Sequence, residues 1–241
     1  MTVPTLSSFL PGPSTALLAG AAGLALAWGV GTAAARLRSR GVRVPYTRKL
    51  FHLGIFSGAA LVHALGGLPA TNAYGAVVAA WVLLAVHRGE GDPLYEALAR
   101  DTDRPHRTLF ILVPLATTAV GGILSALLAG PFAAVGYVVA GWGDAVGEPV
   151  GARWGRHPYR VPSLVGVPAR RTGEGSAAVF AAGAAAALVA LVGLGVPSGT
   201  ALLVAPAVAA VATAVEAVSH HGTDNLTVQL AASLVALALA G

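Results

Sequence analysis

Long apolar stretches separated by short polar connections make up most of the chain. We identify eight, at approximately 14–35, 50–68, 74–87, 108–129, 131–152, 175–195, 199–219 and 225–240. A helix needs about 20 apolar residues to cross a bilayer, and most of the eight approach that length. The stretch 74–87 is short, so we expect it to be tilted, re-entrant or extended at its ends. The pattern predicts an all-α, polytopic membrane protein with 1–241 as a single integral-membrane domain.

Composition supports this class. Of the 241 residues, 56% are hydrophobic and only 10% are charged, whereas soluble domains carry about 25% charged residues. The 31 glycines suit close helix packing in lipid. The chain has no cysteine, which excludes disulfides, thiolate catalysis and cysteine-bound metals. Residues 1–13 form a short N-terminal tail without a basic segment, so we expect no cleaved signal peptide.

The positive charges are distributed asymmetrically. All 15 lysines and arginines fall in or beside the connections after the first, third and fifth stretches, the last two being the loops 88–107 and 153–174. Because positive residues mark cytoplasmic loops, we expect these loops inside and both termini outside, in the inner membrane if the source is prokaryotic. The loop 88–107 is expected to hold either a short surface helix or a solvated connector.

Two acids stand at the end of the fifth stretch. Asp144 and Glu148 are four residues apart and share a helix face, where like charges repel. A divalent cation would remove that repulsion; the alternative is pairing with Arg153 or Arg156. Glycines recur beside them every fourth residue, at 143, 147, 151 and 155, and would let another helix or a ligand approach closely.

The sequence RRTGEGS at 170–176 leads into the sixth stretch. Thr172 can cap the helix, whose free first-turn N–H groups, at Gly175 and Ser176, would form an anion site. Arg170 and Arg171 could hold phosphate oxygens. The alternative is a topology anchor with an ordinary cap.

Two further polar groups lie at helix ends. At the junction of the last two stretches, the oxygens of Glu216, Asp224 and Asn225 suit magnesium; His221 with Asp224 would suggest zinc, and an ordinary polar turn is the other alternative.

The second group opens the second stretch, where Arg48 and His52 lie one turn apart. His52 could accept a proton from a substrate hydroxyl, whereas Arg48 and Lys49 could simply anchor the helix. Lys49 is the only lysine, so any chemistry that needs an amine has one candidate. The chain lacks the Gly-Lys-Ser/Thr signature of a P-loop.

These motifs, in this order, resemble the CTP-dependent polyprenol kinases, a family that includes dolichol, phytol and farnesol kinases. The blocks are RKLFH at 48–52, GDA at 143–145 with the glycines that follow, RTGEGS at 171–176, and a tail at 216–227. The resemblance covers about residues 46–230. Many relatives have a lysine where this chain has Arg171, a change that preserves phosphate binding but not a role for an amine.

The resemblance implies a mechanism. CTP is the expected phosphoryl donor and Mg²⁺, or Mn²⁺, the expected metal, with a lipid alcohol as the acceptor. It implies catalytic roles for Asp144, His52, Lys49 and Glu174. The implied nucleotide-binding residues are Arg48, Arg153, Arg156, Arg170, Arg171, Thr172, Gly175 and Ser176. The implied metal ligands are Asp144, Glu148, Glu216, Asp224 and Asn225. We expect no nucleic-acid partner, and a homodimer is compatible with the sequence.

Two other functions stay open at this point. The block at 143–155 is also similar to phosphatidate cytidylyltransferases, which transfer CMP to a lipid phosphate, but this chain lacks the lysine-bearing tail of those enzymes. Release of CDP would indicate a kinase and release of pyrophosphate a cytidylyltransferase. A small-solute transporter would place its charges near the middle of the membrane, whereas here they crowd one surface.

Overall fold

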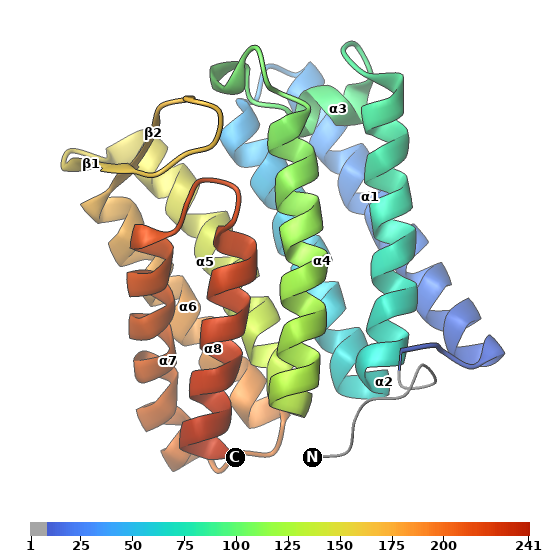
Figure 1. Ribbon diagram of the computed structural model, residues 1–241, viewed down its shortest axis with the longest axis vertical. Helices are drawn as coiled ribbons and strands as arrows, with labels where there is room; N and C mark the ends of the chain where they lie inside the picture. Colours follow the sequence, from blue (N-terminus) through green and yellow to red (C-terminus); the bar gives the residue numbers. More distant parts are fainter. Residues whose placement is uncertain (1–8) are drawn as a thin grey trace.

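The structure, a computed structural model, describes residues 9–241 as one helical bundle (Figure 1). Its long helices are α1 (Pro13–Ser39), α2 (Val44–Arg88), α4 (Leu109–Ala129), α5 (Ala133–Trp154), α6 (Gly173–Gly193), α7 (Ser198–Val218) and α8 (Asp224–Ala240). The predicted all-α class is confirmed. Of the predicted tail 1–13, residues 1–8 lie outside the described part of the chain.

Helix α2 folds back on itself and supplies two of the predicted stretches. The reversal occurs at Gly67, whose φ of +63° is readily adopted only by glycine, and Pro69 follows without a backbone N–H. Tyr74 Oη donates to the carbonyl of Ile55 at 2.9 Å and joins the two arms. The second arm continues to Arg88, so the short stretch 74–87 is the core of a longer helix, as one of the expected alternatives proposed.

The remaining boundaries agree with the predicted pattern. Five stretches have the length and hydropathy of membrane spans, and two of them, Val44–Arg88 and Leu109–Trp154, are double length. A 3-10 turn at Gly130–Phe132 separates α4 from α5 within the second. Helix α8 is a shorter apolar helix of 17 residues. With each double stretch counted as two, the described residues form eight apolar passes.

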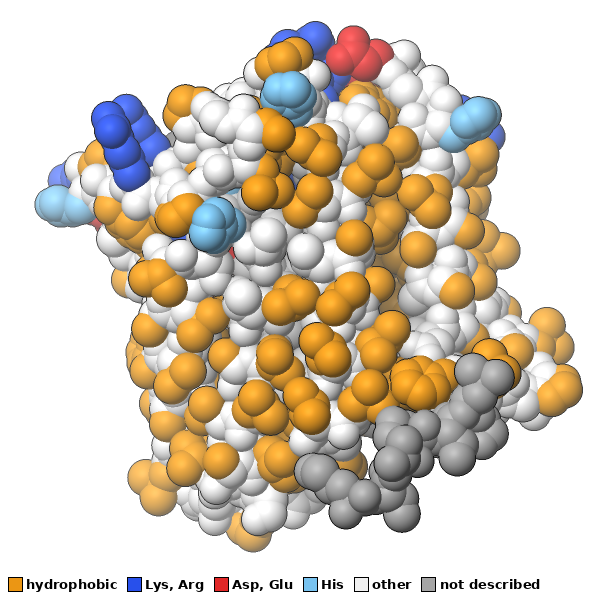
Figure 2. Space-filling view, in the orientation of Figure 1, with side chains coloured by type: hydrophobic (Ala, Val, Ile, Leu, Met, Phe, Trp, Pro, Cys, Tyr) orange, Lys and Arg blue, Asp and Glu red, His pale blue; other side chains and the backbone are white. Residues whose placement is uncertain are grey.

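Charged side chains gather at one end of the bundle, the end that carries the strands and α3, while the flank below is apolar (Figure 2). The loop 88–107 contains the predicted short helix, α3 (Pro93–Leu98), which Asp92 caps by accepting from the N–H groups of Leu94 and Tyr95. That this end faces the cytoplasm stays a prediction.

A small β-ribbon in the loop 153–174 was not predicted. Strands β1 (Pro158–Val161) and β2 (Ala169–Thr172) pair antiparallel, with Arg160 opposite Arg170. Four residues per strand are too few to reveal a two-residue periodicity in the sequence.

Helix α5 lies in the middle of the bundle and packs through its glycines. A side chain at Gly136 would collide with Ser233 and with the backbone of α8, and one at Gly141 would collide with Phe56. The glycine row at 143, 147 and 151 faces Val179, Gly175 and Thr172, so the close approach expected there is made by the start of α6.

Candidate active site

A polar cavity of about 290 Å³ lies at the charged end, where α5, β2, the start of α6 and the α7–α8 turn meet. It brings together nine of the predicted site residues: Asp144, Glu148, Arg170, Arg171, Thr172, Gly175, Ser176, Glu216 and Asp224. These residues come from three motifs that are far apart in the sequence. The fold therefore brings together three motifs whose meeting the sequence left open.

Lys49 links the first turns of α2 to the acids of α5. Its side chain is only 3% exposed, and Nζ lies 2.5 Å from Asp144 Oδ2 and 2.8 Å from Glu148 Oε2. The ammonium therefore occupies the position between the two carboxylates in which the sequence predicted a metal ion. It also offsets their mutual repulsion, because both acids project from the same face of α5.

Arg100 is a site residue that sequence reasoning missed. It follows α3, and its Nη2 donates to Glu148 Oε2 at 2.6 Å while Nη1 lies 3.0 Å from Nε2 of His221. Burial, with a further contribution from the Arg100 charge, lowers the pKa of His221 to about 3, so the imidazole is neutral and its Nε2 accepts from Arg100. The sequence offered no signal for Arg100 beyond its membership of a basic loop.

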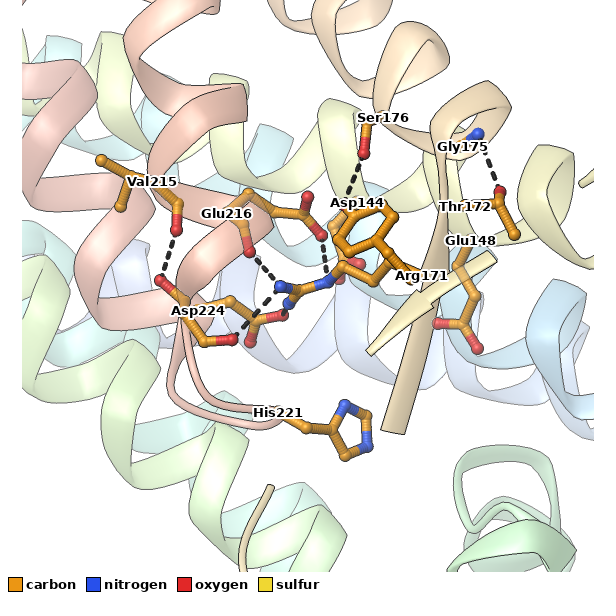
Figure 3. A network of polar contacts seen from close by, with 12 residues as sticks. Asp144, Glu148, Arg171, Thr172, Gly175, Ser176, Val215, Glu216, His221 and Asp224 are labelled. Carbon is orange, nitrogen blue, oxygen red and sulfur yellow. Dashed lines mark hydrogen bonds and ion pairs between the residues drawn. The ribbon is translucent and has the colours of Figure 1, made fainter. Parts of the chain in front are cut away.

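Arg171 is held inside the protein by two acids (Figure 3). Nε contacts Glu216 Oε1 at 2.6 Å, Nη2 donates to Asp224 Oδ2 at 2.9 Å, and Nη1 donates to the carbonyls of Glu216 and Ser219. The side chain was predicted to bind phosphate, but its donors are used to join β2 to the α7–α8 turn. The Arg171 charge stabilises two acids that would otherwise be uncompensated.

The first turn of α6 lines the polar cavity, but the N–H of Gly175, which was predicted to bind an anion, is used by the helix cap. Thr172 Oγ1 accepts from Gly175 N–H at 3.0 Å, which confirms the predicted cap. Ser176 Oγ lies 2.7 Å from Tyr159 Oη, so the ribbon closes against the first turn of the helix. Arg170 lines the cavity, is exposed, and makes no ion pair among the described residues.

Besides Arg48, Lys49 and His52, four predicted residues do not line the polar cavity. The Glu174 carboxylate accepts from the N–H groups of Arg156 and His157 and contacts Nδ1 of the His157 ring at 2.6 Å, so it fastens the loop after α5. Arg156 is exposed, and Arg153 lies over the ring of Trp154 at 5.1 Å.

Asn225 is the fourth of these residues. Its Nδ2 donates to Thr118 Oγ1 at 2.8 Å and faces a different cavity, because adjacent residues at the start of a helix point about 100° apart.

That second cavity is apolar and larger, at about 440 Å³. It lies below the polar cavity, between the two arms of α2, α4 and parts of α5 and α8. Most of its lining is aliphatic or aromatic, for example Phe51, Ile55, Leu115 and Ile123. Arg48 and His52, from the N-terminal part of α2, also line this cavity. They place a charged and a titratable side chain where it approaches the polar cavity.

His52 connects the two cavities. Its ring stacks on Phe56 with the centroids 4.2 Å apart, and Nε2 lies 3.3 Å from Asp144 Oδ2. The angles of that contact do not make a hydrogen bond, so Nε2 is a buried polar atom without a partner. Arg48 Nη1 is likewise buried and unpartnered. Unpaired buried polar atoms are rare and costly, so their presence at this junction favours a polar ligand there.

Fewer residues at the polar cavity are free to bind magnesium than the sequence predicted. Among residues 9–241, no group of three His, Cys, Asp or Glu side chains is arranged to hold a metal ion, so neither the five-ligand set nor the zinc alternative is assembled. Glu148 is held by Lys49 and Arg100, and Asp224 by Arg171. However, Glu216 Oε2 is buried without a hydrogen-bond partner and lines the same cavity as Asp144. Magnesium commonly takes one or two carboxylates and completes its shell with substrate phosphates and water.

Comparison with known proteins identifies one informative relative. The chain is 33% identical to the phytol kinase of Synechocystis sp. over 195 residues, which cover 80% of this chain and 78% of the relative. No protein-family model matches the chain, and no solved structure matches it.

Proposed function

Because the chain belongs to the family of phytol and polyprenol kinases, we propose that it transfers the γ-phosphoryl group of CTP to the hydroxyl of a prenyl alcohol. The observation that carries this proposal is the junction of the two cavities. His52 lines the apolar cavity, and its Nε2 is 3.3 Å from an oxygen of Asp144, which lines the polar cavity. An acceptor from the lipid and a donor from the aqueous side would meet at that point.

The acceptor side consists of the apolar cavity and the two unpartnered groups at its end. A prenyl tail lies among the aliphatic side chains, and its hydroxyl reaches His52 and Arg48. His52 Nε2 accepts the hydroxyl proton as the oxygen bonds to the γ-phosphorus. The bond from that phosphorus to the bridging oxygen breaks, and CDP leaves with the electron pair.

The donor side is the polar cavity. Arg170 and the first turn of α6 bind phosphate oxygens, with the Ser176 hydroxyl beside them. Asp144 and Glu216 would hold magnesium, which supplies positive charge to the phosphoryl group during transfer. Lys49 is a positioning residue, because it fixes the carboxylate of Asp144. The asymmetry of positive loops supports a cytoplasmic position for this end, in the inner membrane if the source is prokaryotic.

The test uses the purified full-length chain in lipid nanodiscs with magnesium, phytol and CTP labelled at the γ-phosphorus. We expect labelled phytyl phosphate and free CDP, and Asp144→Asn should lower the rate at least about a hundredfold. The control is Arg40→Met, because Arg40 is exposed at the end of α1 and makes no ion pair among the described residues. Release of pyrophosphate with phosphatidate as the acceptor would instead establish a cytidylyltransferase. Competition by unlabelled ATP, GTP and UTP reports the choice of nucleotide.

A further inference from the structure

The apolar cavity has an opening on the flank of the bundle. Gly75 and Ala76 on the second arm of α2, and Ala119 on α4, line the cavity and are also exposed. They carry no bulky side chain to close the seam between the two helices. A molecule in the surrounding lipid can therefore enter sideways between α2 and α4.

The lining residues give the depth of the cavity. On α4 they run from Phe110 to Ile123, and on the second arm of α2 from Thr71 to Val82. At a rise of 1.5 Å per residue these stretches measure about 20 Å and about 17 Å. The far end lies at the reversal of α2, where Leu68 and Thr71 line the cavity and Thr71 Oγ1 donates to the carbonyl of Gly67 at 2.8 Å.

We propose that this cavity is a chain-length gauge that selects prenyl alcohols with a main chain of about sixteen carbons. This inference rests on the proposed function. An extended hydrocarbon chain advances about 1.3 Å per bond, the projection of a C–C bond of about 1.5 Å, so the longer of the two stretches, about 20 Å, accommodates roughly sixteen carbons. The hydroxyl then lies at His52 and Arg48, and the tail ends beside Thr71.

Selection by this gauge depends on fit rather than on hydrophobicity. The tail leaves a bilayer that is as apolar as the cavity, so transfer itself supplies no driving force. A shorter tail leaves part of the lining without contacts, which forfeits dispersion attraction. A much longer polyprenol must leave through the seam beside Gly75 and Ala119, where part of the chain returns to lipid.

Gly75 is the position from which the cavity can be shortened. A Cβ built there meets nothing within 4 Å, so a larger side chain extends into open space without a clash. Gly75 lies seven residues from Val82, about 10 Å along the helix, which leaves room for roughly eight main-chain carbons above it. Gly29 on α1 provides the matched control, since it is also helical, exposed and free of neighbours within 4 Å but does not line the cavity.

The experiment measures kcat/KM of the full-length protein with CTP and with geraniol, farnesol, phytol or a long polyprenol. We expect the wild type to prefer phytol. Gly75→Phe should lower kcat/KM for phytol at least about tenfold more than it lowers kcat/KM for geraniol, and Gly29→Phe should change neither. Activity on geraniol shows that the variant is folded; Gly75→Leu, a smaller plug, should shift the preference in the same direction.

Two failures can be told apart. If the wild type phosphorylates none of these alcohols, the proposed function is wrong. If it phosphorylates phytol but Gly75→Phe and Gly75→Leu keep the wild-type order of preference, the gauge is wrong and the kinase proposal stands.

Discussion

Replacement of Lys49 by methionine is expected to destabilise the protein strongly. The side chain is 3% exposed and contacts Asp144 and Glu148 at 2.5 and 2.8 Å. At an effective dielectric constant of about 20, each contact corresponds to roughly 6 kcal/mol of attraction, most of which is offset by desolvation of the charges. Methionine preserves the length of the side chain but leaves Asp144 without its cation. Breaking a buried pair in this way costs about 3–5 kcal/mol.

Thermal unfolding in detergent micelles, followed by tryptophan fluorescence, measures this effect. A loss of about 3–5 kcal/mol corresponds to a decrease in Tm of roughly 6–20 °C for a chain of this size. The double variant Lys49→Met/Asp144→Asn removes the uncompensated carboxylate and should recover about half of the loss. Arg40→Met, at an exposed position, should leave Tm within about 2 °C of the wild type. If Lys49→Met cost less than about 1 kcal/mol, or if the double variant recovered nothing, the buried-pair argument would be refuted.

Three other outcomes follow from the site. Arg171→Ala should lower the free energy of unfolding by about 3–5 kcal/mol in the same assay. Arg171→Lys should recover only part of this loss, because one ammonium cannot satisfy both acids. Equal stability of the two variants would contradict this reasoning. Burial lowers the pKa of His221 to about 3, whereas a histidine in the unfolded chain has a pKa of about 6.5. The contribution of His221 to stability is therefore complete above about pH 6.5 and is lost as the pH falls toward 3. His221→Gln should therefore lose less stability than the wild type on acidification from about pH 7.5 to pH 5, and parallel Tm curves would argue against it. Glu174→Gln should keep kcat within about tenfold of the wild type, since its carboxylate fastens a loop outside the cavity; a loss comparable to that of Asp144→Asn would restore the predicted catalytic role.

The order of the helices and the placement of the motifs at one end of the bundle could be predicted, because each depends on local signals. Apolar length defined the passes, and the confinement of positive residues to alternate connections predicted that the motifs at Asp144, Arg171 and Asp224 share one end of the bundle. Thr172 could be identified as a cap because capping depends on neighbouring residues.

The pairing of charges could not be predicted in the same way. Arg171 and Asp224 are 53 residues apart, and only the packing of β2 beside the α7–α8 turn makes them partners. Lys49 was recognised as the single amine, but its position between Asp144 and Glu148 depends on how α2 crosses α5. The two cavities were likewise invisible in the sequence, since each is formed by residues from several helices.

The burial of Lys49 also has a practical consequence for labelling. Lys49 is the only lysine of the chain, and in the folded protein it is enclosed by two carboxylates. An amine-reactive reagent can therefore modify a lysine only when α2 and α5 separate at this end. The rate of modification at position 49, read by mass spectrometry, would report how often the junction opens, with no probe introduced into the protein.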